Sequence, residues 1–215
     1  RPEQISQLHE RASRWLGAHG HINEALHHAL AAGNPTLAAD WVAQAGRPAL
    51  LRGEFMRVKQ WLKQLPDTLL RERPDVGVLD VVMQIVIGGQ EKIAQRLAEV
   101  ERALRAQEAA PAVWAEWRIY KAHYELSQLH TEAALILCQQ AVSEDSSDYI
   151  VGYAAVLRGI AHRMMGEPDQ AIEQFNQSLA LNERTGNLSM AIGAALSLAE
   201  LYEVNGQLTR SEQVL

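Results

Sequence analysis

The chain has 215 residues, of which 47% are hydrophobic, 21% are charged and 6% are aromatic. This composition is too apolar for a disordered segment and suffices for one or two hydrophobic cores. The net charge is −6, and residues 141–215, with four basic and ten acidic side chains, hold the whole excess of negative charge. Because nucleic-acid-binding domains usually carry a basic patch, the chain is a poor candidate for contact with DNA or an anionic membrane. Its longest uncharged runs are fifteen residues, and a membrane span needs about 18 apolar residues.

The first part of the chain predicts closely spaced helices. Gly33-Asn34-Pro35 combines a C′ glycine, an N-cap asparagine and a first-turn proline, so one helix should end there and the next begin with almost no loop. In an earlier helix, over Ile5–Leu16, apolar residues recur on one face at helical spacing. They are Ile5, Leu8, Ala12, Trp15 and Leu16.

Two further stretches in the first half have a distinct composition. Basic side chains concentrate between Arg47 and Arg73. A solvated helix face is the commoner role of such a run, and a surface for a partner is the alternative. The run Val81–Ile87 is rich in β-branched residues, but the apolar residues Val78, Leu79, Val82 and Val86 follow helical spacing and predict a buried helix.

A helix–turn–helix unit recurs along the chain. In each unit, a turn position is followed five residues later by a small or apolar residue in a second helix, and successive turn positions lie 33 to 40 residues apart. This spacing is typical of an α-solenoid. Glycine permits the left-handed turn, and a small residue lets the second helix approach the first. The pairs are Gly20/Ala25, Gly53/Val58, Gly89/Ala94, Leu129/Ala134, Gly166/Ala171 and Gly206/Ser211.

Residues 152–215 resemble the tetratricopeptide repeat. One unit carries Gly159, His162, Gly166, Ala171, Phe175 and Ser178 at the spacing of that family, and the next carries Ala199, Tyr202, Gly206 and Ser211. His162 replaces the usual aromatic residue, Ser211 replaces the usual alanine, and the period exceeds the usual 34 residues. The resemblance predicts an all-α, right-handed α-solenoid over residues 1–215, with about six helix pairs. The sequence stops inside the second helix of its last unit, so we expect a truncated repeat and a longer parent chain.

The amino-terminal half resembles the MalT-like subgroup of large LuxR-type bacterial transcription activators. The segments that carry the resemblance are Leu8–Leu16, Gly20–Asn34, Leu50–Glu54, Trp61–Pro66 and Leu69–Pro74. It implies MalT-like amino-terminal repeats over 1–105 and tetratricopeptide-like repeats over 106–215. In this family a STAND ATPase module and a winged helix precede the solenoid, and a helix-turn-helix follows it. The resemblance thus implies ATP as a cofactor of the parent protein. This chain has no phosphate-binding loop of the form G-x-x-x-x-G-K-[ST], so we expect no ATPase activity from it.

No catalytic or metal site is expected from the sequence. The adjacent His27 and His28 diverge by about 100° on a helix, and the sequence has neither an H-E-x-x-H motif nor a pair of cysteines. The single cysteine, Cys138, cannot form an internal disulfide, which favours a reducing compartment such as the cytoplasm. It takes the repeat position of Phe175, so we expect it to pack as an apolar side chain.

A stripe of aromatic residues is the candidate effector site. First helices of solenoid repeats line the concave groove, where polar-tipped rings can contact a ligand while they bury area. The alternative is that the rings are packing residues between helices. The candidates are Trp117, Tyr120, Tyr124, Tyr153 and His162, with Arg118 and Lys121 beside them as partners for an anionic group. The expected function is an effector-sensing domain for a small molecule or a protein, and the alternative is a protein–protein scaffold of tetratricopeptide type.

Overall fold

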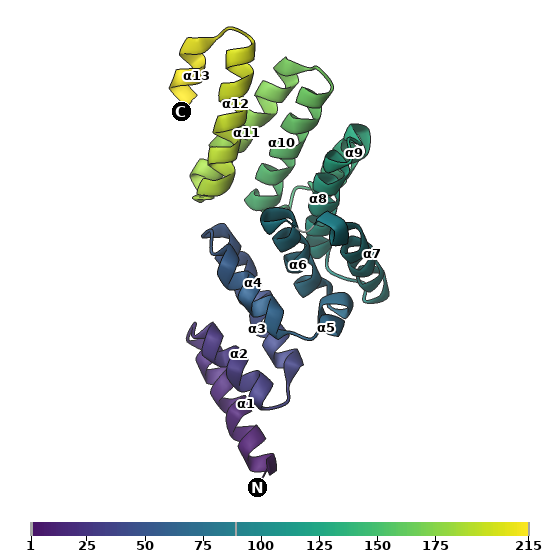
Figure 1. Cartoon of the computed structure of the whole chain (residues 1–215), viewed down its shortest axis with the longest axis vertical. Helices are drawn as coiled ribbons and strands as arrows, with labels where there is room; N and C mark the ends of the chain where they lie inside the picture. The colour runs from purple at the N-terminus through teal and green to yellow at the C-terminus, as the bar shows by residue number, and fades with distance from the viewer. Residues whose placement is uncertain (1, 89, 215) are drawn as a thin grey trace. The chain divides into compact units, whose positions relative to one another are not determined.

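The structure is a computed structural model that describes residues 2–88 and 90–214. Within these ranges it contains thirteen α-helices and no β-strand, which confirms an all-α chain (Figure 1). The chain divides into two compact units, an amino-terminal unit of residues 1–109 and a carboxyl-terminal unit of residues 110–215. The change of character predicted at 105–106 therefore lies in the last turn of the final helix of the amino-terminal unit.

The amino-terminal unit holds seven described helices. They are α1 (Pro2–Ala18), α2 (Ile22–Ala31), α3 (Pro35–Leu51), α4 (Phe55–Gln64), α5 (Asp67–Glu72), α6 (Pro74–Ile87) and α7 (Gln90–Ala106). Helix α6 packs against α3, α4, α5 and α7. The β-branched run is helical, as predicted, because α6 buries most of its apolar residues from Val76 to Met83, but Val86, which was expected on the buried face, is 47% exposed. At the α2–α3 junction, the side chain of Asn34 accepts a hydrogen bond from the amide of Leu37 at 3.0 Å, and Pro35 begins α3.

Helix α1 packs through small polar residues rather than through its apolar stripe. Ile5, Leu8 and Trp15 are 55%, 62% and 59% exposed. On a neighbouring face, the hydroxyl of the fully buried Ser13 donates to the carbonyl of Ala25 at 2.8 Å. A Cβ at the nearby Gly17 would lie 2.4 Å from the ring of Trp41, so only glycine admits this ring. The periodicity thus identified the helix correctly, but it did not identify the face that packs.

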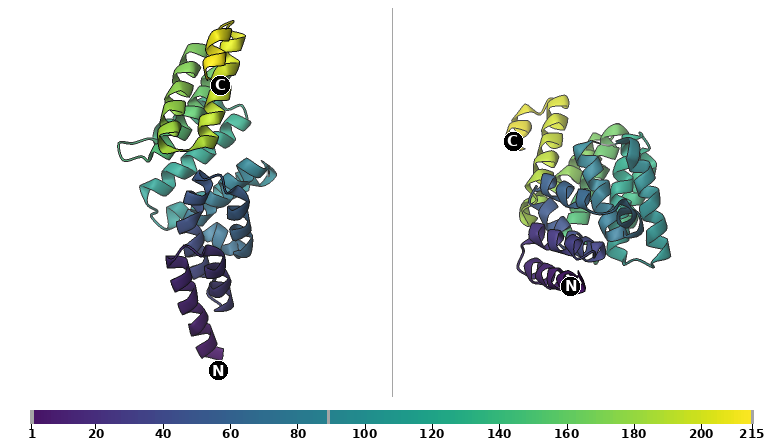
Figure 2. Two further views of the ribbon diagram at one scale, coloured as in Figure 1. Left: turned by 90° about the vertical axis from the view of Figure 1, so that its left-hand side faces the viewer. Right: turned by 60° about the horizontal axis from the view of Figure 1, so that its bottom comes forward.

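The carboxyl-terminal unit holds six described helices in three pairs. They are α8 (Pro111–Ser127), α9 (Thr131–Ala141), α10 (Asp148–Met164), α11 (Pro168–Thr185), α12 (Leu188–Val204) and α13 (Leu208–Val214). Helix α11 lies beside both α10 and α12, as the views of Figure 2 also show. Their shared core contains Ala171, Phe175, Leu198, Leu201 and Tyr202.

The turn positions of the repeat are confirmed with one shift. Leu129 has a φ of 64°, and Gly20, Gly53, Gly166 and Gly206 have φ values between 71° and 80°. The residues five positions later are all buried: Ala25, Val58, Ala134, Ala171 and Ser211.

The shift concerns the predicted pair Gly89/Ala94. Gly89 lies outside the described residues, and Ala94 is exposed rather than packed. The neighbouring Gly88 takes a φ of 87°, and Ile93 is buried. The register of this unit is therefore Gly88/Ile93, one residue earlier than predicted, because the first of two adjacent glycines makes the left-handed turn.

Candidate functional site

Most of the predicted aromatic stripe is buried in the packing of the carboxyl-terminal unit. Trp117 and Tyr120 on α8 are 8% and 2% exposed, and Tyr153 on α10 is 7% exposed. The rings of Tyr120 and Tyr153 meet edge to face with their centroids 6.0 Å apart, a favourable aromatic geometry. These three rings therefore pack between helices, which was the alternative reading of the stripe.

The hydroxyls of the two buried tyrosines are hydrogen-bonded to Tyr149 and His123, which are not among the predicted site residues. The hydroxyl of Tyr120 lies 3.1 Å from the hydroxyl of Tyr149, and the hydroxyl of Tyr153 lies 2.9 Å from Nδ1 of His123. Burial raises the pKa of Tyr153 and lowers the pKa of His123, so both side chains are held neutral. Position 123 follows Tyr120 by three residues, and this helical spacing was the signal that could have identified it.

The remaining predicted site residues are half-buried and engaged locally. Lys121 forms an ion pair with Glu125, and its Nζ lies 5.1 Å from the ring centroid of Tyr124. Arg118 lies over the ring of Trp114, with its Cζ 5.5 Å from the centroid. On α10, Nδ1 of His162 is 2.7 Å from Oε2 of Glu167. Ligand binding by these residues stays a prediction. Tyr124 and Lys121 are only half-buried, so part of their surface is accessible to a ligand.

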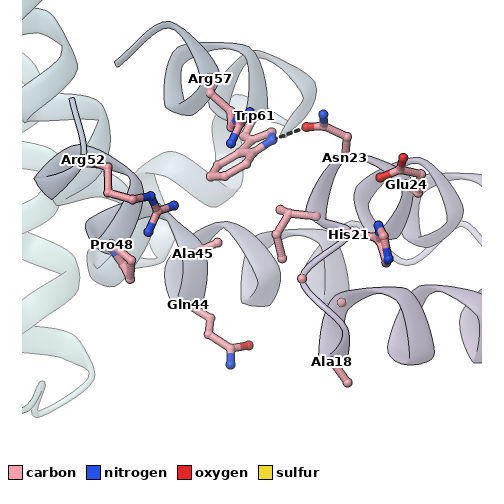
Figure 3. A pocket seen from close by; sticks show the side chains of 13 residues that line it. Ala18, His21, Asn23, Glu24, Gln44, Ala45, Pro48, Arg52, Arg57 and Trp61 are labelled. Carbon is pink, nitrogen blue, oxygen red and sulfur yellow. Dashed lines mark hydrogen bonds between the residues drawn. The ribbon is translucent and has the colours of Figure 1, made fainter. Parts of the chain in front are cut away.

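A second site lies in the amino-terminal unit. A pocket of about 450 Å³ is formed by the α1–α2 turn, the carboxyl-terminal half of α3 and the helix α4 (Figure 3). This volume is within the range of small-molecule sites, roughly 300–1,000 Å³. Arg52 and Arg57 lie toward one end, His21 and Glu24 toward the other, and Trp61 between them.

The cationic end of the pocket has more positive than negative charge. Arg52 donates through Nε to Oε1 of Glu54 at 2.6 Å, and Arg57 donates through Nη1 to Oε2 of the same carboxylate. The pKa of Glu54 is lowered, chiefly by the hydrogen bond from Arg52, so the carboxylate stays ionised. Two guanidinium groups share one carboxylate, which leaves both Nη groups of Arg52 and Nη2 of Arg57 as donors that Glu54 does not occupy.

The rest of the pocket is lined by both apolar and polar residues. The indole Nε1 of Trp61, a residue only 3% exposed, donates to Oδ1 of Asn23 at 2.6 Å, which fixes the ring (Figure 3). Helix α2 begins at this wall, and the side chain of its N-cap residue, His21, makes no capping hydrogen bond. A helix start of this kind carries partial positive charge.

Two kinds of site are absent from the described residues. No group of three or more His, Cys, Asp or Glu side chains in residues 2–88 and 90–214 is arranged to hold a metal ion. Over the same ranges, no helix combines the length and the apolar character that a membrane span requires.

The geometry defines an all-α protein of repeated helix pairs, and comparison with known proteins adds distant relatives. No protein-family model matches the chain. The chain is 24% identical to the HTH-type transcriptional regulator MalT of Yersinia enterocolitica over 207 residues, which cover 94% of this chain and 23% of the regulator. The MalT of Serratia proteamaculans is 25% identical with the same coverage. The chain is thus distantly similar to MalT regulators over most of its length, and it spans less than a quarter of theirs.

Two other proteins show more limited similarity. The serine/threonine-protein kinase PknK of Mycobacterium tuberculosis is 30% identical over 106 residues, which are 49% of this chain and 9% of the kinase. Among solved structures, the MamA protein aligns with a TM-score of 0.47 and 16% identity over 82% of this chain and 87% of that chain.

Proposed function

We propose that this chain is the effector-sensing repeat domain of a MalT-like, LuxR-family transcriptional regulator. The observation that carries the proposal is the similarity to MalT regulators over 94% of the chain, together with the repeated helix pairs. In this proposal, a small-molecule or protein effector binds here in the cytoplasm. The modules for ATP and DNA belong to other parts of the parent chain, and this domain is not itself an enzyme.

The proposed mechanism is a population shift. An effector that prefers one arrangement of the helix pairs biases the parent between a resting and an active state. Moving that equilibrium from 1:99 to 99:1 requires about 5.5 kcal/mol of differential binding. Packed helix pairs suit this role because each contacts mainly its neighbours, so a local change passes along the array.

The alternative function is a protein–protein scaffold of tetratricopeptide type. One observation favours it: Leu188, Ile192 and Leu196 follow one another on a single face of α12 and are 68%, 59% and 50% exposed. Exposed apolar stripes are typical of surfaces that contact other proteins.

A thermal-shift screen of the purified chain against a panel of metabolites tests the proposal. A ligand at 100 times its Kd stabilises the state it binds by about 2.7 kcal/mol, which corresponds to a rise of several degrees in Tm. A sensor should respond to one metabolite or a few related ones. A chain whose Tm no metabolite changes, but which binds a purified partner protein, would instead be a scaffold.

A further inference from the structure

We propose that the pocket of the amino-terminal unit binds a small polar organic anion, whose carboxylate or phosphate group is held by Arg52 and Arg57. The inference names a site and a ligand class for the proposed sensor, and it rests on that function only in treating the chain as a ligand-binding module. It concerns the basic stretch between Arg47 and Arg73, for which sequence alone left a partner surface as an alternative to a solvated face.

The charges at the arginine end of the pocket select an anion. Glu54 neutralises only one of the two guanidinium groups, and it holds them at the same end of the pocket through bonds of 2.6 and 2.5 Å. Their remaining N–H groups match the geometry of a carboxylate or phosphate, which guanidinium groups bind in a bidentate manner. Arg52 and Arg57 are 58% and 53% exposed, so a ligand reaches them without unfolding any helix.

The opposite end of the pocket selects hydroxyl or amino groups. Glu24 and His21 line this end, away from the arginines (Figure 3). The amide nitrogen of Asn23, next to this end, and the side chain of Gln44 on α3 add hydrogen-bonding groups to the lining (Figure 3). A compact ligand with one anionic group and several hydroxyl groups therefore fits the distribution of donors and acceptors, and the volume of about 450 Å³ accommodates it.

Nuclear magnetic resonance on the 215-residue chain tests the site with three probes that share a polyhydroxyl framework: glucose 6-phosphate, gluconate and uncharged glucose. The chain has five tryptophans, so the indole N–H signal of Trp61 can be assigned with a Trp61→Phe variant. At about 0.15 M salt, which screens non-specific attraction, we expect at least one anion to shift this signal in a saturable manner and glucose to leave it unchanged. A response to gluconate alone identifies a carboxylate as the ligand group, and a response to glucose 6-phosphate alone identifies a phosphate.

Charge-neutral variants locate the anion. Arg52→Gln and Arg57→Gln should each weaken binding at least about tenfold. Arg14→Gln is the matched control, because Arg14 is an exposed arginine of the same unit that pairs with Glu10 away from the pocket. This control should change the affinity less than about twofold.

Three results would overturn the assignment: no saturable shift from either anion at about 20 mM, an equal shift from glucose, or unchanged affinity in both pocket variants. The metabolite screen repeated on Arg52→Gln separates this failure from failure of the proposed function. A metabolite response that persists in that variant would preserve the sensor and remove the anion site.

Discussion

At the residue scale, the thiol of Cys138 is expected to be unreactive in the folded chain. Cys138 is buried within α9, and burial raises its pKa to about 12, so almost no thiolate exists at pH 8. A disulfide reagent such as Ellman's reagent should therefore label the native chain only as fast as the surrounding helices open, and label the denatured chain at once. Rapid stoichiometric labelling of the native chain would show that this position is accessible.

Two glycines in the carboxyl-terminal unit should respond to alanine with opposite signs. A Cβ at Gly159 would lie 2.6 Å from Cε1 of the fully buried Phe175, whereas a Cβ at Gly193 meets no described atom within 4 Å. Gly159→Ala should lower the free energy of unfolding by roughly 1–3 kcal/mol through overpacking. Gly193→Ala should raise it by roughly 0.5–1 kcal/mol, because alanine is the better helix residue. Urea unfolding measures both, and equal effects would contradict the close approach of α10 and α11.

The sequence patterns predicted the positions of the turns, but they did not predict which face of α1 packs against its neighbours. The left-handed turns at Gly20, Gly166 and Gly206 follow from local backbone requirements that glycine alone meets at low cost. The packing of α1 through Ser13 depends on Trp41, a residue of a later helix, whose indole Nε1 donates to the Ser13 hydroxyl at 3.0 Å. Contacts between residues that are far apart in the sequence cannot be predicted from the spacing of apolar residues within one helix.

At the scale of elements, Arg96 joins three helices of the amino-terminal unit. Its guanidinium donates to Asp67 on α5 at 2.6 Å, to Asp80 on α6 at 2.8 Å and to Glu99 within α7 at 2.9 Å. Arg96→Met should lower the free energy of unfolding by roughly 2–4 kcal/mol, because it removes the close guanidinium partner of the largely buried carboxylates Asp80 and Glu99. Asp80 then keeps a hydrogen bond from Gln84, and Glu99 keeps one from Gln95 and the more distant Arg71 at 3.7 Å. The matched control Arg14→Met breaks only an exposed pair and should cost less than about 1 kcal/mol. Equal effects would show that this network contributes no more than a surface ion pair.

The contribution of Arg96 should also depend on pH. The pKa of Asp67 is lowered from its ordinary value of 3.8, chiefly because Arg96 donates a hydrogen bond to it. A lowered pKa in the folded state stabilises the fold fully above the unfolded value, and this stabilisation is lost as the pH falls through the folded value. The difference in stability between the wild type and Arg96→Met should therefore be constant near neutral pH and shrink below about pH 4. A difference that grows on acidification would contradict this origin.

Some residues of the aromatic stripe are buried between helices and others are partly exposed. The loss of stability in alanine variants should distinguish the two groups. Trp117 is buried, so Trp117→Ala should lower the free energy of unfolding by about 3–5 kcal/mol. Tyr124 is half-buried beside Lys121, so Tyr124→Ala should cost roughly 1 kcal/mol. Denaturant midpoints of the two variants give the comparison, and a large loss in both would remove Tyr124 from the effector site as well.

At the scale of the whole molecule, the period of 33 to 40 residues was enough to predict an all-α chain of helix pairs. The pocket of the amino-terminal unit was not predictable in the same way. Its lining comes from three separate segments around Gly20, Pro48 and Trp61, and only packing brings them together. The basic stretch supplied the one hint, because Arg52 and Arg57 belong to it.

The division into two units predicts that residues 110–215 fold on their own. Helix α11 packs against α10 and α12 within this unit, and buried side chains such as Phe175 and Leu198 form its core. In a repeat array stability is approximately a sum over repeats and their interfaces, so a unit with its own core should remain folded when separated. The isolated segment should show helical circular dichroism and a cooperative urea transition, and its Cys138 should stay protected from Ellman's reagent. A segment that lacks the transition and exposes the thiol would show that this unit depends on residues before Ala110.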